Sequence, residues 1–244
     1  MELLLAKYGK LTPLREAEEQ AFRSLALQKR SFERGQTLMF DDFDDPDQLF
    51  IVESGRLFAS SDLPNGERAI TRLYFAGDIV GTANIPFEKA TQTITVNAPS
   101  VLYVFPRANL IKAFTDLPRV AAIFYTFAAL ENTILNDRLV SIGRTRGKAR
   151  LAALILEVAT RHNLTYEVEE EWFPMGLTQA QMGDAIGLTE VQVNRVMREL
   201  DAAGLIKRRG DQMKITDVDQ LCDVGHFQDR YQDLDIEWFK EIID

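Results

Sequence analysis

A short pattern occurs twice in this chain and determines how the residues around it fold. Thr178 is followed three residues later by Gln181, Thr189 is followed by Gln192, and a leucine precedes each threonine. A threonine so placed accepts a hydrogen bond from the third helical N–H, while the glutamine accepts one from the threonine's own N–H. Two helix starts are therefore predicted, and Gly187 between them predicts the end of the first helix. A short helix, a glycine turn and a longer helix are typical of a helix-turn-helix, whose second helix enters the DNA major groove.

The second helix has one apolar side and one polar side. At about 100° per residue, its buried stripe is predicted to be Val193, Val196, Met197 and Leu200. The opposite side carries Val191, Arg195, Arg198 and Ala202. Arg195, in the middle of that side, suits the paired acceptors of a guanine edge, and Val191 can meet a thymine methyl group. The alternative is an ordinary hairpin of two helices with a solvated arginine face.

The residues that follow this helix favour the DNA-binding interpretation. Gly204 ends the helix, and residues 205–215 read as two short strands around a Gly-Asp turn. The first of these strands carries Arg208 and Arg209. A basic hairpin beside the second helix is typical of a winged helix-turn-helix, so this pattern lowers the weight of the plain helical hairpin.

The net charge of −9 conceals local basic clusters. Residues 1–141 contribute −3, residues 142–216 contribute +1 and residues 217–244 contribute −7. Cations gather ahead of the helix-turn-helix, at Arg144, Arg146, Lys148 and Arg150, and again on the second helix and the hairpin. Local clusters govern attraction to phosphates more than total charge does, so we expect modest DNA affinity with a sharp salt dependence.

A different pattern fills residues 31–105, where short apolar runs alternate with turn residues. The runs are Thr37–Phe40, Leu49–Glu53, Arg56–Ser60, Ala69–Phe75, Thr91–Asn97 and Val101–Phe105. This spacing predicts a small antiparallel barrel or jelly roll. Ahead of it, Thr12-Pro13 predicts a capped helix with proline at its first position.

A long helix is predicted after Pro118, because the apolar period becomes helical. Its stripe, Ile123, Phe127, Leu130 and Ile134, steps by four, three and four residues, and further apolar residues widen it. One side of such a helix can lie on the barrel and the other needs a second chain. We therefore predict a parallel homodimer whose contacts include these four residues; the alternative is a helix packed only within its own chain.

The predicted fold is of the α+β class, with five segments along the chain. They are a β-barrel, sensor-like domain (1–116), a dimerisation helix (117–142), a hinge (143–147), a winged helix-turn-helix (148–216) and an acidic helical tail (217–244). Apolar residues at three- to four-residue steps from Leu221 to Leu234 predict that the tail is an amphipathic helix. No apolar run approaches a membrane span, and the first residues do not resemble a secretory signal, so a cytoplasmic protein without membrane contact is expected.

In this order, a jelly roll, a long helix, a hinge and a winged helix-turn-helix resemble the CRP/FNR family of bacterial transcription regulators. The most specific matches are residues 177–189 with Val193-Asn-Arg195, and Phe75-Ala-Gly-Asp-Ile-Val-Gly81 in the barrel. The resemblance implies a cyclic-nucleotide-binding-like barrel and a homodimer on a two-fold symmetric operator of double-stranded DNA. It also implies contact with RNA polymerase. Arg195 matches the family's base-reading arginine, but Val191 stands where a glutamate is usual and Glu190 lies one residue earlier.

The barrel departs from the cyclic-AMP-binding members at the positions that hold ribose and phosphate. Where those members have Glu and an Arg-Ser pair, this chain has Thr82, Gln92 and Thr93. These three residues mark a possible effector pocket, but a buried phosphate needs charge compensation that Gln92 cannot supply. No cyclic AMP is therefore expected. With Cys222 as the single cysteine, no iron–sulfur cluster is expected, and no metal site is proposed.

These observations define the expected site and function. Arg195, Gln192, Val191 and Glu190 are the candidates for reading bases, although a closed capping box would withdraw Gln192 from the groove. The candidates for holding phosphates are Thr178, Gln179, Thr189, Arg198, Arg208 and Arg209. The expected function is a dimeric transcription regulator, an activator, and not an enzyme, since no nucleophile pair or phosphate loop is present.

Other interpretations of function stay open. One is a small-molecule-binding protein built on the barrel, and another is an interaction adaptor whose winged domain does not read DNA. The switch is open as well, between a neutral ligand, a redox change at Cys222, which the nearby Asp223 disfavours, and control by abundance alone.

Overall fold

The computed structural model describes residues 1–39, 47–166 and 171–234. Two compact units are distinguished. The first contains Met1–Ser61, Leu73–Asn132 and the chain from Tyr231, and the second contains Asp62–Arg72 and Thr133–Arg230. Phe40 of the first predicted strand and residues 235–244 of the predicted tail lie outside the described residues.

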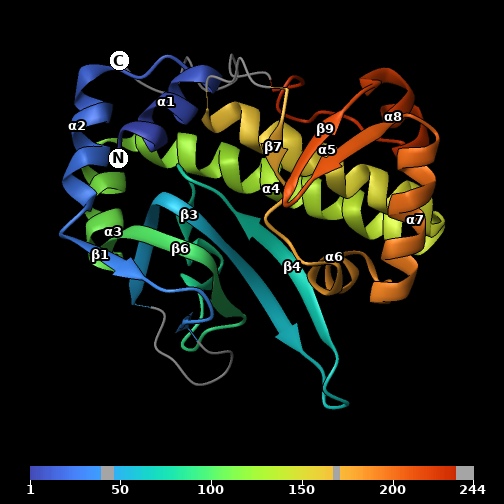
Figure 1. Ribbon diagram of the computed structural model, residues 1–244. Helices are drawn as coiled ribbons and strands as arrows, with labels where there is room; N and C mark the ends of the chain where they lie inside the picture. The colour runs from blue at the N-terminus through green and yellow to red at the C-terminus, as the bar shows by residue number, and fades with distance from the viewer. Residues whose placement is uncertain (40–46, 167–170, 235–244) are drawn as a thin grey trace. The chain divides into compact units, whose positions relative to one another are not determined.

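An antiparallel sheet forms the centre of the first unit, as predicted (Figure 1). Its hydrogen-bonded order is β1-β6-β3-β4, with β2 also paired to β6 and β5 to β3. The sheet encloses an apolar core that includes Phe50, Leu57, Tyr74, Ile94 and Leu102. The strands are β1 (Gln28–Phe32), β2 (Thr37–Met39), β3 (Gln48–Asp62), β4 (Arg68–Tyr74), β5 (Ile79–Val80) and β6 (Thr93–Pro106).

Two strands are longer than predicted, because β3 and β6 each join two of the expected runs. The join in β3 lies at Gly55, which has a φ of 95° and sits among shifts of the β3–β6 register. A Cβ atom at Gly55 would lie 2.2 Å from Ser100 Oγ and 2.6 Å from the Pro99 carbonyl oxygen. Glycine thus lets the bent β3 lie close against β6, and the predicted turn becomes an irregularity inside a pair of strands.

Helices pack on the strands around a second apolar core, which also contains Leu49, Ile51 and Phe105. These helices are α1 (Glu2–Leu11), α2 (Glu16–Leu25), α3 (Arg107–Asp116) and the first half of α4 (Pro118–Arg144). The predicted start at Pro13 is wrong: α2 begins at Glu16, where the Glu18 carboxylate accepts a hydrogen bond from the Arg15 N–H at 2.9 Å. The Glu18 carboxylate also forms an ion pair with Arg119 of α4, 2.6 Å from its Nε. Glu18 therefore both caps the start of α2 and links α2 to α4.

The Phe75–Gly81 motif attaches α1 to the sheet. The Asp78 carboxylate forms a buried ion pair with Lys7 and accepts a hydrogen bond from the Phe75 N–H at 2.8 Å. Gly77 has a φ of 84°, and a Cβ there would lie 2.8 Å from the Leu3 carbonyl oxygen. The motif therefore holds the close approach of α1 to the turn between β4 and β5.

Of the four residues predicted as the dimerisation stripe on α4, two are buried within their own subunit, and the dimer contacts of the other two stay predictions. Ile123 and Leu130 are only 1% and 4% exposed, within the core of their own chain. Phe127 is half-buried and stacks on Tyr8 with ring centroids 4.0 Å apart, and Ile134 is also half-buried. Ile123 and Phe127 pack on the chain itself because α1, which was not predicted, lies against them. The exposed apolar residues of α4 are instead Tyr125, Leu135, Leu139 and Val140.

The second unit contains the predicted winged helix-turn-helix. Its three-stranded sheet has the order β7-β9-β8, and Ile206 to Arg209 pair antiparallel with Ile215 to Gln212. Outside the sheet, α8 packs on α5, and a Cβ at Gly225 would lie 3.0 Å from the Ala153 nitrogen. Beside the end of α4, the elements are α5 (Gly147–Thr165), β7 (Phe173–Pro174), α6 (Gln179–Ile186), α7 (Glu190–Ala202), β8 (Ile206–Arg209), β9 (Gln212–Ile215) and α8 (Val218–Gly225).

The helix predicted for the tail is shorter than its apolar period suggested. It ends at Gly225 because His226 adopts the left-handed conformation, with a φ of 48°. Residues 226–234 contain turns and no helix.

The predicted hinge is also shorter. Gly143 lies inside α4 and Gly147 begins α5, so only Thr145 and Arg146 lie between the helices. Arg150 donates to the Thr145 carbonyl oxygen at 3.1 and 2.9 Å and to that of Ile186 at 3.4 Å. The junction is therefore bound on both sides by hydrogen bonds.

Two searches of the described residues were negative. None of their helices is both long enough and apolar enough to cross a membrane. Across residues 1–39, 47–166 and 171–234, His, Cys, Asp and Glu side chains form no group of three or more that could hold a metal ion.

Candidate nucleic-acid interface

Both predicted helix starts of the helix-turn-helix are confirmed. The Thr178 hydroxyl accepts from the Gln181 N–H at 3.1 Å, and the Gln181 side chain accepts from the Thr178 N–H at 2.9 Å. In the second box the corresponding distances, for Thr189 and Gln192, are 3.3 and 2.9 Å. Gly187 ends α6 in the left-handed conformation with a φ of 65°. Each box satisfies two N–H groups that a helix N-terminus leaves unpaired.

Two contacts that the sequence did not reveal fix α6 against α7. A Cβ at Gly183 would lie 2.2 Å from the Leu188 carbonyl oxygen, so only glycine lets the turn pack on α6 this closely. The Asn194 amide of α7 donates to the Gln179 side-chain oxygen at 2.9 Å. Gln179, predicted to hold a phosphate, thus also positions α7. The only signal in the sequence for the close crossing is a glycine inside a helical segment.

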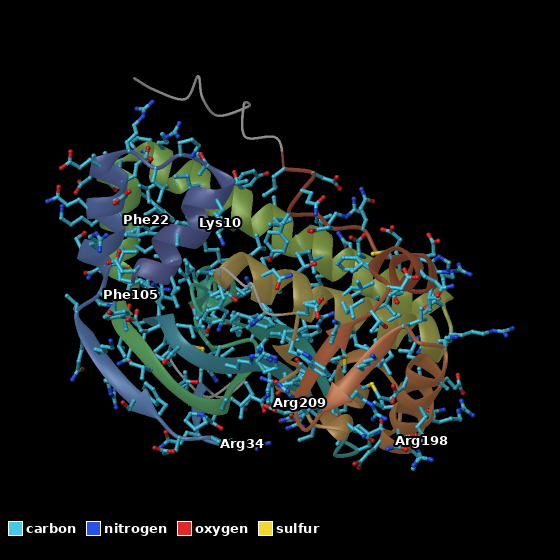
Figure 2. All side chains as sticks on the ribbon, turned by 45° about the horizontal axis from the view of Figure 1, so that its top comes forward. Lys10, Phe22, Arg34, Phe105, Arg198 and Arg209 are labelled. Carbon is cyan, nitrogen blue, oxygen red and sulfur yellow. The ribbon has the colours of Figure 1, made fainter. Side chains whose placement is uncertain are left out.

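The two faces of α7, which we call the recognition helix, are as predicted. Val193, Val196, Met197 and Leu200 are buried. On the other face Val191 is 80% exposed and the Arg195 side chain 71% exposed, with Arg195 Nε 3.6 Å from Glu199 Oε1. Arg198 is exposed on the same helix (Figure 2). An exposed valine and two exposed arginines form a face that suits base edges and phosphates.

The first turn of the recognition helix is less favourable for base reading. Because its capping box is closed, the Gln192 side-chain oxygen is used within the helix start. That geometry withdraws one of the two groups with which a glutamine recognises adenine. Glu190 and Thr189 are exposed beside it. Base contacts by Glu190 and Gln192 stay predictions, with Gln192 the weaker of the two.

The arginines of the β8–β9 hairpin are held by neighbouring side chains. Arg208 Nη2 lies 3.3 Å from Asp201 Oδ2 at the end of the recognition helix. Arg209 donates to the Gln212 side chain at 2.8 Å, and its guanidinium carbon lies 4.9 Å from the centre of the Trp172 ring. Trp172 was not among the predicted site residues. These contacts restrain two cations at the predicted phosphate-binding surface.

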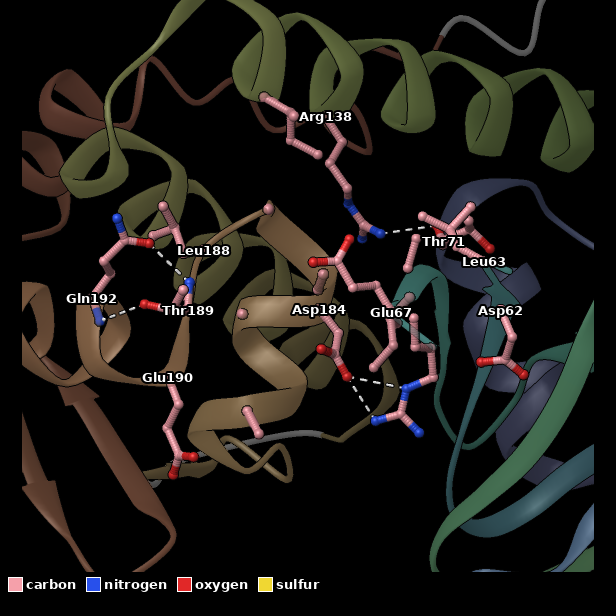
Figure 3. A pocket seen from close by; sticks show the side chains of 18 of the residues that line it. Asp62, Leu63, Glu67, Thr71, Arg138, Asp184, Leu188, Thr189, Glu190 and Gln192 are labelled. Carbon is pink, nitrogen blue, oxygen red and sulfur yellow. Dashed lines mark hydrogen bonds and ion pairs between the residues drawn. The ribbon is translucent and has the colours of Figure 1, made fainter. Parts of the chain in front are cut away.

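A cavity of about 910 Å³ within the second unit borders the start of the recognition helix (Figure 3). It is lined by residues of 62–71, the last turns of α4, α6 and residues 187–192. Arg68 donates twice to Asp184 of α6, at 3.0 and 2.6 Å, and Arg138 of α4 donates to the Thr71 carbonyl oxygen at 2.9 Å. The segment 62–71 is thereby fixed both to α6 and to α4.

The three residues predicted to mark an effector pocket lie in or beside the segment between β5 and β6. Thr82 begins a short 3-10 helix, η1 (Thr82–Asn84), while Gln92 and Thr93 stand at the start of β6. Buried Asn84 organises this segment: its oxygen accepts from the Thr91 N–H and hydroxyl at 3.0 and 2.8 Å. The pocket itself stays a prediction.

Cys222 is half-buried on α8. Burial raises the pKa of its thiol, and the carboxylates of Asp219, Asp223 and Asp229 raise the pKa further. The thiolate is the reactive form, so this environment disfavours rapid oxidation. The raised pKa of the Cys222 thiol agrees with the direction expected from the Asp223 carboxylate alone.

Comparison with known proteins links these two units to described domains. Residues 29–116 match the family model of a cyclic nucleotide-binding domain, and residues 149–224 match that of a Crp-like helix-turn-helix domain. The chain belongs to the CRP/FNR family. Regulators of transcription, rather than enzymes, make up this family.

Three curated relatives of this CRP/FNR chain span much of its length. The transcriptional regulatory protein btr of Bordetella pertussis is 26% identical over 206 residues, which is 84% of either chain. The fumarate and nitrate reduction regulatory protein of Escherichia coli K12 is 24% identical over 220 residues, covering 87% of this chain and 85% of that one. A protein described as a probable transcriptional activator of Rhizobium leguminosarum is 27% identical over 161 residues, 65% of each chain.

Among solved structures, FixK2 of Bradyrhizobium japonicum has the same fold. The match has a TM-score of 0.73 with 20% identity, and covers 81% of this chain and 96% of that chain. The predicted fold class, an antiparallel cyclic-nucleotide-binding-like domain followed by helices and a C-terminal helix-turn-helix, is confirmed.

Proposed function

We propose that this CRP/FNR-family chain is a homodimeric, sequence-specific transcription activator that reads a two-fold symmetric operator. The observation that supports base reading most directly is the exposed face of the recognition helix. Arg195 projects from its middle while the opposite face is buried. Binding of DNA by one such helix per subunit accounts for an operator with two equal half-sites.

The residues divide into two roles on this face. Arg195 and Val191 read bases, with Glu190 and Gln192 at the margin. Phosphates are held by Arg198, the hairpin arginines Arg208 and Arg209, and the start of α6 at Thr178 and Gln179, with Thr189 at the start of the recognition helix. Helix N-termini favour anions because their N–H groups point outward.

The test starts with DNA selected from a random pool by the wild-type protein. We expect Arg195→Ala to weaken binding to the selected operator by about 1–3 kcal/mol, or about 5- to 150-fold, and to relax specificity at one base pair per half-site. Arg198→Ala is the matched control, because losing a phosphate contact weakens binding to operator and random DNA alike. An equal loss on both DNAs for Arg195→Ala argues against base reading.

The dimer is proposed to form along the exposed side of α4 rather than along its buried stripe. Tyr125, Leu135 and Leu139 are 66%, 49% and 68% exposed on this helix. Three large apolar side chains in contact with solvent on one helix are typical of an interface. Sedimentation of the full chain as a monomer at micromolar concentration would contradict this part of the proposal.

Activation requires contact with RNA polymerase, in the cytoplasm and away from membranes. A relative's description as a probable transcriptional activator supports this direction of regulation. In transcription with purified polymerase, we expect the protein to raise the output of a promoter that carries the selected operator upstream. A decrease would show a repressor, and no DNA binding in a salt-dependent gel shift would favour the adaptor interpretation.

For the barrel we propose that neither cyclic AMP nor an iron–sulfur cluster is the effector. Between Gly81 and Gln92 the only cation is Lys89, which is exposed, and the buried polar side chain of this segment is the neutral Asn84; Arg107 of α3 is used on the Ile85 carbonyl oxygen. A cyclic phosphate inside the barrel lacks a compensating charge there. We expect calorimetry with cyclic AMP to show no binding, while thermal-shift screening of neutral metabolites tests for another small effector.

A further inference from the structure

The exposed side of α4 carries a regular stripe of residues. Tyr125, Leu135 and Leu139 belong to it, and exposed Ala128 and Asn132 complete it. Successive members are three, four, three and four residues apart, which is the a/d spacing of a two-stranded coiled coil. In this spacing Tyr125, Asn132 and Leu139 occupy a positions, while Ala128 and Leu135 occupy d positions. We call these five residues the exposed stripe.

Asn132 is the one polar member of the exposed stripe. Its side chain is exposed, and within the described part of the chain its amide has no hydrogen-bond partner. Nothing in its own subunit therefore explains an asparagine at this position. Burial against an apolar surface leaves the amide without its bonds to water, and an unsatisfied buried amide is costly.

One arrangement satisfies this amide, and it requires a second copy of the same chain. In a parallel pair of α4 helices in register, the two Asn132 side chains meet in one layer, and one amide donates to the other. An antiparallel pair, or a shift by one heptad, places Asn132 against residues such as Ala128, Leu135 or Leu139. A helix of an unrelated partner offers a matching amide only by coincidence. The occupant that this stripe fits is an identical helix.

The edge of the exposed stripe allows two helices to approach. Ala129 and Asn136, which flank it at e positions, are small and exposed. On the g side Arg138 is turned into its own subunit, where it donates to both oxygens of Glu157 at 2.6 and 2.8 Å. Glu131, the other charged residue at a g position, is half-buried and has an interaction within its own subunit. In the proposed interface, the layer that contains the two Asn132 side chains therefore places amide groups between layers of Tyr, Ala and Leu side chains.

We infer that Asn132 sets the register and parallel orientation of the homodimer and restricts its partner to another copy of this chain. The inference rests on the proposed dimer. A buried asparagine at one a position specifies register and number of strands in parallel coiled coils, at a cost in stability. Here it excludes helices that carry an aliphatic residue in the same layer.

The partner test mixes wild-type and Asn132→Ile chains that carry different tags, and counts dimers by native mass spectrometry. We expect the two homodimers to dominate and the mixed dimer to fall at least about fivefold below the statistical ratio, because it leaves one amide unpaired. The matched control is Asn136→Ile, one helical turn further on and outside the stripe, which we expect to mix statistically with wild type. Free mixing of Asn132→Ile with wild type overturns the inference.

The orientation test uses cysteines in the Cys222→Ser background. Leu139→Cys chains are expected to form a disulfide with one another on oxidation, whereas Tyr125→Cys mixed with Leu139→Cys should give no mixed disulfide. A 125–139 disulfide shows an antiparallel pair and overturns the inference. Sedimentation of the wild-type chain distinguishes failure of the proposed dimer from failure of this inference. A monomer would contradict the dimer itself. A dimer whose Asn132→Ile form mixes freely with wild type would contradict only the role of Asn132.

Discussion

The close crossing of α6 and the turn before the recognition helix predicts a sharp effect of a single methyl group. In Gly183→Ala the new Cβ would lie 2.2 Å from the Leu188 carbonyl oxygen and 3.3 Å from its carbonyl carbon. The obstacle is backbone, so no side-chain rotation removes it. The turn must move away from α6 by about 1 Å to restore ordinary contact. That movement strains the hydrogen bond from the Leu188 N–H to the Gly183 carbonyl, which is 3.1 Å long.

The expected magnitude follows from two opposing effects. Overpacking a close contact costs about 1–3 kcal/mol, and replacing a helical glycine by alanine returns about 0.5–1 kcal/mol. We therefore expect Gly183→Ala to lower the free energy of unfolding of the second unit by about 0–2.5 kcal/mol, with a central value of about 1 kcal/mol. DNA affinity should fall as well, because the recognition helix is displaced relative to α6.

Gly143→Ala is the matched control in the same unit. Gly143 is also helical, and nothing lies within 4 Å of an added Cβ. We expect this variant to gain about 0.5–1 kcal/mol, the opposite sign. Urea unfolding followed by tryptophan fluorescence, together with a gel shift on the selected operator, measures both variants. Equal stability and equal DNA affinity for Gly183→Ala and Gly143→Ala would refute the reasoning.

Further predictions concern the helix start, the hairpin and the cysteine. Thr189→Ala should destabilise the second unit by about 0.5–2 kcal/mol in urea unfolding, whereas Thr189→Ser keeps the hydroxyl and should stay close to wild type. Trp172→Leu removes the ring beside Arg209 and should weaken binding to operator and random DNA alike by about two- to fivefold, and a loss confined to the operator would contradict this role. Alkylation of Cys222 should reach half its maximal rate at a higher pH in the folded chain than in urea, because the pKa of the folded thiol is raised; a lower midpoint would indicate an activated thiol.

Local signals predicted the DNA-binding unit well. The two Thr-Gln boxes and Gly187 act within one turn of chain, so their geometry can be read without knowledge of the rest of the fold. The faces of the recognition helix followed from periodicity for the same reason. Gly183 was not singled out, because its role depends on a carbonyl that the fold brings back to it from Leu188.

The first unit was less predictable because its contacts are distant in sequence. Both sides of α4 are apolar, and periodicity alone does not say which side meets α1 and which meets solvent. Ile123 was therefore assigned to the wrong interface. Four of the five side chains of β1 are exposed, so Gln28–Phe32 has no apolar alternation to mark it as a strand. The turn expected at Gly55 became part of β3 because Ser100 and Pro99 lie opposite it.

The junction between α4 and α5 is short and held by side-chain hydrogen bonds. Arg150 reaches from α5 to the Thr145 and Ile186 carbonyls, and the Arg138–Glu157 pair joins the last turns of α4 to α5. With two residues between the helices, little slack is left in the chain. We therefore expect the end of α4 and the start of α5 to move together rather than to bend at Thr145 and Arg146.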